Sequence, residues 1–173
     1  MVLKMIGGIF VVGACGGIGN YFAMCLERRV EELTQLYHAV LELQGEIRYA
    51  ATPLSEVMVT LGKQGNGRIA DWFLTIGKEM ELADGRSLAE IVRQTGYVEL
   101  QKTVLTKQDK EQLFRLGDSL GRLDKTQQLL ATEYYLKGLQ GEIEEAKKIK
   151  KERSYLYRCL SILTGVFLMI LML

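Results

Sequence analysis

Two apolar runs end the chain, and between them apolar residues recur at helical spacing. Neither run, 5–26 or 159–173, contains a charged residue. In the centre, apolar residues recur every three or four positions, and no useful length of sequence alternates with the period of two typical of a strand. The pattern predicts an all-α protein: an antiparallel helical bundle between an N-terminal and a C-terminal transmembrane helix.

The first run is long enough to cross a membrane. As a helix, residues 5–26 span about 33 Å, and the hydrocarbon core of a bilayer is about 30 Å thick. Gly13, Gly17 and Gly19 give this segment a face of small residues, and Gly13 and Gly17 are four positions apart. Small residues at that spacing let a second helix approach closely. We therefore expect residues 1–26 to form a transmembrane helix that packs through these glycines.

The same segment has a second interpretation as a lipoprotein signal. Lys4 precedes a short apolar run, and residues 12–15, Val-Gly-Ala-Cys, resemble a lipoprotein cleavage box. The apolar run continues past Cys15 to Leu26, however, whereas the apolar region of a signal peptide stops at its cleavage site. The transmembrane interpretation is therefore preferred.

The second run predicts another membrane helix, residues 155–173. With 155–158 included, its helix is about 28 Å long, and Tyr155 and Tyr157 have the amphipathic character typical of a membrane interface. Basic residues between 147 and 158 flank its inner end, as Arg28 and Arg29 flank the first span. The positive-inside rule then places residues 27–154 in the cytoplasm.

Local signals divide the centre into helices. The first span continues to about Tyr49, because a proline follows, and a short helix is expected over 53–61. Thr52 would cap this helix, with Pro53 at its first helical position. Glycines at 62, 65 and 67 predict a turn, and a helix containing Ile69, Trp72, Phe73 and Ile76 then closes near 84–85.

Three further helices complete the predicted bundle. Ser87 and Glu90 have capping-box spacing and open a short helix through Gln94. Residues 106–109 start another helix, whose end Gly117 and Gly121 weaken. The last helix runs from about Asp124 to the C-terminal span. Apolar stripes are expected on the first and last helices: Val30, Leu33, Leu36, Tyr37, Val40, Leu43 and Ile47, and Leu136, Leu139, Ile143, Ala146 and Ile149.

Composition offers little support for catalysis, metal binding or nucleic-acid binding. The formal net charge is +1, with 22 basic and 21 acidic residues, so a charge match to nucleic acid is absent. There is one histidine, and the three cysteines, Cys15, Cys25 and Cys159, lie in the apolar ends. The carboxylates are scattered among basic residues. We therefore expect a protein that is not an enzyme, holds no cofactor or metal, and binds protein partners and membrane lipid.

Several segments resemble the stage III sporulation protein AB family of endospore-forming bacteria. The most specific part comprises Glu46-Ile47-Arg48-Tyr49 followed by Ala51-Thr52-Pro53-Leu54-Ser55-Glu56. The short N-terminal span, the glycines at 117 and 121, and the basic helix before an apolar tail agree with it. The resemblance thus extends from end to end.

The resemblance implies a membrane scaffold, without catalytic residues, in the channel that joins mother cell and forespore. The family is similar to half of the inner-membrane platform protein of type II secretion and type IV pilus systems. Its partners would be a secretion-type ATPase (the stage III AA protein), other channel membrane proteins and further copies of itself. Localisation would be the bacterial cell membrane, with the centre on the mother-cell side. We expect Tyr49, Thr52, Ser55 and Glu56 to contribute to partner contact.

Two alternatives to that function remain open at this stage. A platform fragment of a general type II secretion or type IV pilus system would share the same architecture. A lipoprotein or membrane-tethered enzyme is the third interpretation.

Overall fold

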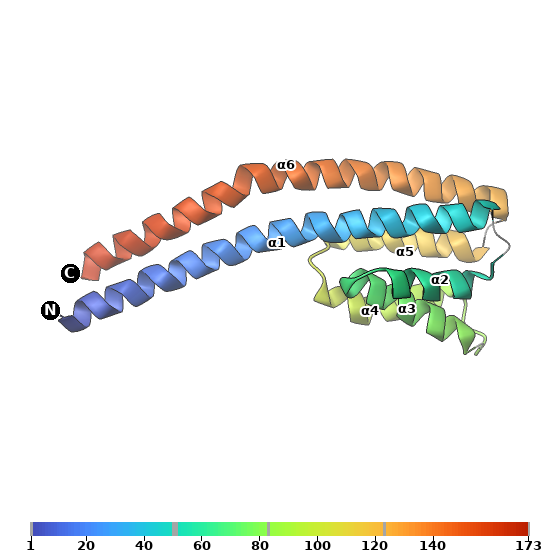
Figure 1. Ribbon diagram of the computed structural model, residues 1–173, viewed down its shortest axis with the longest axis horizontal. Coiled ribbons are helices and arrows are strands. Elements are labelled where there is room, and N and C mark those ends of the chain that lie inside the picture. Colours follow the sequence, from blue (N-terminus) through green and yellow to red (C-terminus); the bar gives the residue numbers. More distant parts are fainter. Residues whose placement is uncertain (1, 50–51, 83, 123, 173) are drawn as a thin grey trace. The chain divides into compact units, whose positions relative to one another are not determined.

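The computed structural model describes residues 2–49, 52–82, 84–122 and 124–172. Within the terminal helices, the side chains of 2–12, Cys15 and several residues from 158 onward lie outside this description. The described residues form six α-helices and one short 3₁₀ helix, and contain no strand, which confirms the all-α prediction (Figure 1). The order is α1 (Val2–Tyr49), α2 (Leu54–Gln64), α3 (Gly67–Glu81), α4 (Leu88–Glu99), η1 (Leu100–Lys102), α5 (Lys107–Arg122) and α6 (Lys125–Met172).

The chain divides into two compact units, 31–143 and 1–30 with 144–173. In the central unit, 31–143, a core of large side chains joins all the helices. Its most deeply buried members are Leu33, Leu36, Val40, Leu43, Ile69, Trp72, Ile76, Leu100 and Thr132. The stripe on α1 is thus centred on Leu36 and Leu43 as much as on Leu33 and Val40, whereas Tyr37 and Ile47 are only half-buried.

The terminal unit contains the first part of α1 and the last part of α6. These segments run antiparallel, because the Glu27 carboxylate pairs with Lys150 while the Phe22 ring lies 5.7 Å from that of Tyr157. The two segments approach closely at Gly19, where an added Cβ would lie 2.6 Å from the carbonyl oxygen of Tyr157.

Among the described residues, no helix combines the length and the apolar character that crossing a membrane requires. The predicted spans, 1–26 and 155–173, fall partly on residues whose side chains lie outside the description. Membrane insertion and the predicted limits of the central domain, 27 and 154, therefore stay predictions.

Helix boundaries show where the local signals were right. The first helix ends at Tyr49 as predicted, α3 closes before residue 84, and Asp124 accepts a hydrogen bond from the backbone N–H of Gln127 at the start of α6. Ser87 and Glu90 form the predicted capping box. The segment 106–109 also opens a helix, because the backbone N–H groups of Thr106 and Asp109 each donate to the other's side chain, at 2.8 and 3.1 Å.

Two predicted boundaries around α2 are wrong. Pro53, in extended conformation, is the N-cap and the helix begins at Leu54, so Thr52 is not the cap. The Thr52 hydroxyl instead donates to a Glu46 carboxylate oxygen, at 3.3 Å. Gly62 lies inside α2 rather than in the turn, because the helix continues to pack against Leu74 of α3.

Two further predictions, about the ends of α4 and α5, also need correction. The helix α4 continues past Gln94 to Glu99, since Thr95 and Gly96 are buried against its neighbours. Gly117 does not weaken α5, which runs to Arg122. A Cβ at Gly117 would lie 2.7 Å from a methyl group of Val92, so the glycine allows α4 and α5 to cross closely.

Candidate docking groove between α1 and α2

The residues expected to contact a partner lie at and after the end of α1. Tyr49 is 84% exposed, and Thr52 and Glu56 are also exposed. Ser55 is half-buried, because its carbonyl lies at the close approach of α2 and α3 beside Gly77. Three of these four side chains are therefore accessible to a partner. Ser55 contributes to the packing of α2 against α3 more than the sequence suggested.

Glu56 and Thr52 belong to a hollow of about 210 Å³ between α1 and α2. Val57 and Leu61 form its apolar floor, and both are buried. Its rim carries three carboxylates, Glu42 and Glu46 from α1 and Glu56 from α2, with no basic side chain among the lining residues. Tyr49 and Ser55 do not line it.

These carboxylates are not neutralised by neighbours. None of the three forms an ion pair with any described residue, although the Thr52 hydroxyl donates to Glu46. Glu42 and Glu46 are four residues apart on one helix, where like charges repel by a few tenths of a kcal/mol. Glu56 lies in the first turn of α2, where the helix dipole favours negative charge. The hollow therefore presents uncompensated negative charge.

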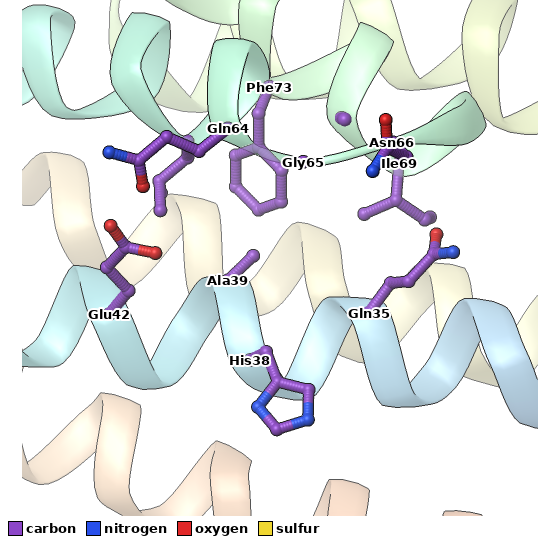
Figure 2. A pocket seen from close by; sticks show the side chains of 11 residues that line it. Gln35, His38, Ala39, Glu42, Gln64, Gly65, Asn66, Ile69 and Phe73 are labelled. Atoms are coloured by element: carbon purple, nitrogen blue, oxygen red, sulfur yellow. The ribbon is translucent and has the colours of Figure 1, made fainter.

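A second hollow of about 370 Å³ continues along α1 and shares Glu42 and Leu61 with the first. Figure 2 shows Phe73 and Ile69 on one side, facing Gln35, Ala39 and Glu42 of α1. The amides of Gln35, Gln64 and Asn66 surround this apolar floor. We call the two hollows together the α1–α2 groove.

Sequence reasoning found one end of this groove and missed most of it. The amides at its rim come from α1, from the last residue of α2 and from the turn that follows, and α1 is distant in sequence from the other two. The glycines at 62, 65 and 67 predicted the turn after α2, but not that amide side chains there would face Gln35 of α1. His38, the one histidine of the sequence, is exposed and lies at the edge of the second hollow.

The three glycines expected to pack membrane helices differ in how closely other atoms surround them. A Cβ on Gly19 would collide with Ser161 of α6, so this glycine is needed where the two terminal helices meet. Gly13 and Gly17 have no atom within 4 Å of an added Cβ. Their small surface is therefore open, and its packing against another helix stays a prediction.

Acidic, cysteine and histidine side chains in the described part of the chain do not gather into a group that would hold a metal ion. Two sets of ion pairs join neighbouring segments of the central unit. Arg86 joins Glu79 and Asp84 in the loop before α4, and Arg93 pairs with Asp118 at 2.7 Å between α4 and α5.

The chain is similar to known proteins along its whole length. The family model for stage III sporulation protein AB matches residues 4–173. Stage III sporulation protein AB of Bacillus subtilis (strain 168) is 24% identical over 172 residues, covering 99% of each chain.

A solved structure of stage III sporulation protein AB agrees in fold. It has a TM-score of 0.68 and 22% sequence identity, and the match covers 72% of this chain and 98% of the other. The match of the family model over almost the full length confirms the family resemblance of the sequence motifs: the chain belongs to the stage III sporulation protein AB family.

Proposed function

We propose that the protein is a membrane scaffold of the mother cell–forespore channel in endospore formation. In this role it couples a secretion-type ATPase to the membrane components of the channel and has no catalytic turnover of its own. Family membership over residues 4–173 supports the developmental process. The α1–α2 groove supports the coupling role, because it offers a partner an apolar floor and an uncompensated acidic rim.

In this proposal, residues 1–26 and 155–173 cross the mother-cell membrane and the central unit faces the cytoplasm. Support comes from the uncharged runs 5–26 and 159–173 and from the basic residues beside their inner ends. The antiparallel pairing of Glu27 with Lys150 also agrees with two helices that enter a bilayer together.

The contact with the ATPase is tested by Glu56→Lys. This change reverses a charge on the exposed rim of the groove without entering the core, so we expect the complex to weaken by about 1–3 kcal/mol. The thermal melt of the variant should fall only modestly, because the lost interaction of Glu56 with the dipole of α2 is typically worth about 0.3–1 kcal/mol. The measurement is a pull-down of the ATPase, with nucleotide present, by the full chain in detergent.

Glu111→Lys is the matched control, since Glu111 is exposed on α5 and does not line the groove. Equal binding by both variants would move the contact to another face. No binding by the unmutated chain to folded, nucleotide-loaded ATPase would refute direct coupling.

A further inference from the structure

A second groove lies in the central unit between α5 and α6. It encloses about 560 Å³, which is within the range of protein binding pockets. Its floor contains Leu116 and Tyr135, both buried, together with Ala131. Burial raises the pKa of the Tyr135 hydroxyl, so the ring stays neutral. The groove is therefore apolar at its base.

One wall of this groove is an exposed face of α6. Tyr134 lines it and is 82% exposed, and Leu130, one helical turn earlier, is 62% exposed. Gly138 follows one turn later and has no atom within 4 Å of an added Cβ. Leu130, Tyr134 and Gly138 follow one another at four-residue steps on one face of α6. Because Gly138 has no side chain, another helix can approach this face closely. Tyrosine is also among the residues enriched in binding hot spots.

The charge at this groove is positive. Arg115 and Lys137 are the charged residues that line it, and no carboxylate does so. Arg115 forms no ion pair with any described residue. Lys137 pairs with Glu133 of the same helix at 3.0 Å, but this pair is largely exposed and is therefore easily exchanged for another partner. The lining therefore offers the unpaired guanidinium of Arg115 and an ammonium group with an exchangeable partner, and both favour a negatively charged occupant.

We propose that the α5–α6 groove binds an acidic, amphipathic helix from another protein. Its apolar stripe would cover Tyr134 and the floor at Leu116, and its carboxylates would reach Arg115 and Lys137. This is the helix-in-groove mode of recognition, in which residues at i, i+3 or i+4 and i+7 anchor the ligand. The groove is separate from the acidic α1–α2 groove, and its opposite charge predicts a different partner segment.

The test uses the full chain in sporulating cells with a photo-crosslinking residue at the groove, Tyr134→p-benzoylphenylalanine. Mass spectrometry then identifies the segment that becomes attached. We expect a segment of another protein that carries net negative charge and has apolar residues at helical spacing. Adding Arg115→Glu or Lys137→Glu should lower the cross-linking yield at least about tenfold, because the variant charge repels carboxylates.

Lys107→Glu is the matched control, because it makes the same charge change on an exposed residue at the start of α5 that does not line the groove. Its yield should stay within about twofold of the parent's. Circular dichroism melts of both groove variants should match the parent, which separates lost binding from lost folding. A basic segment, a second copy of this chain, no cross-link, or a yield unchanged in both correctly folded groove variants would each overturn the proposal.

Discussion

Glycine is required at several helix crossings of the central unit, and only the neighbouring atoms show where. A Cβ on Gly62 would lie 2.5 Å from the backbone nitrogen of Leu74 in α3, and one on Gly77 would lie 2.8 Å from that of Val59 in α2. The two glycines therefore allow α2 and α3 to pack almost backbone to backbone. Gly45, inside α1, has no atom within 4 Å of the same position.

Alanine at these positions should change stability in opposite directions. Gly62→Ala forces α2 and α3 apart and should lower the free energy of unfolding by about 1–3 kcal/mol. Gly45→Ala should raise it by about 0.5–1 kcal/mol, because glycine in a helix interior costs that much relative to alanine. Chemical denaturation of the two variants measures both changes. Equal effects would contradict the close crossing of α2 and α3.

Trp72 provides a second prediction for single residues. It is 1% exposed, and its indole N–H donates to the Thr95 hydroxyl at 3.1 Å. Thr95→Val preserves shape but leaves this buried donor without a partner, so we expect a loss of about 1–3 kcal/mol in the free energy of unfolding.

Thr95→Ser is the control for that prediction. It keeps the hydroxyl and removes one methyl group, worth roughly 0.8 kcal/mol of burial. Urea titrations that follow the tryptophan fluorescence compare the two variants. A valine variant no less stable than the serine variant would show that the hydrogen bond contributes little.

At the scale of elements, the loop from α3 into α4 is held by charged groups. The backbone N–H of Arg86 donates to Asp84 and lowers the pKa of that carboxyl, and the backbone N–H of Ser87 lowers the pKa of Glu90 in the capping box. A carboxyl whose pKa is lower in the folded state contributes stability at pH values above its unfolded pKa. That contribution is lost as the pH falls through the folded value.

Acid should therefore weaken this loop in the pH range below the unfolded carboxyl pKa values, about 4. We expect the melting temperature to fall as the pH is lowered from 5 to 2, with a smaller fall in the double variant Asp84→Asn/Glu90→Gln. The amides keep hydrogen-bonding oxygens but do not titrate. Melts followed by circular dichroism across that range measure the difference. Parallel curves for variant and parent would show that other carboxyls dominate.

Elements with strong local signals could be predicted from the sequence, whereas their continuation could not. The capping box at Ser87 and the start at 106–109 are encoded within four residues, so their positions were correct. The extension of α4 beyond Gln94 depends on Gly96, where a Cβ would lie 2.4 Å from the Phe114 ring of α5. That contact joins residues distant in sequence, and no local pattern indicates it.

The same reasoning applies to the grooves. Glu56 was identified because it stands in a family motif, but Glu42 and Gln64 join it only through the packing of α2 against α1. The α5–α6 groove had no sequence signal at all, because Tyr134 continues a helical pattern like any other exposed residue. The charge of a surface formed by two helices can be determined only when the fold shows which side chains lie together.

For the whole molecule, the proposed topology assigns the central unit to the cytoplasm. Asn66 is a suitable reporter because it is exposed, lies in the turn between α2 and α3, and forms no side-chain cap. We predict that Asn66→Cys, with the three native cysteines replaced by serine, reacts with a membrane-impermeant maleimide only after cells are permeabilised. The reason is the basic residues beside both uncharged runs, which favour the cytoplasmic side. The same cysteine in detergent-solubilised protein gives the full extent of labelling. Labelling of intact cells at the permeabilised rate would place the central unit outside the cytoplasm, away from any ATPase that requires cytoplasmic nucleotide, and would contradict the coupling role as well as the topology.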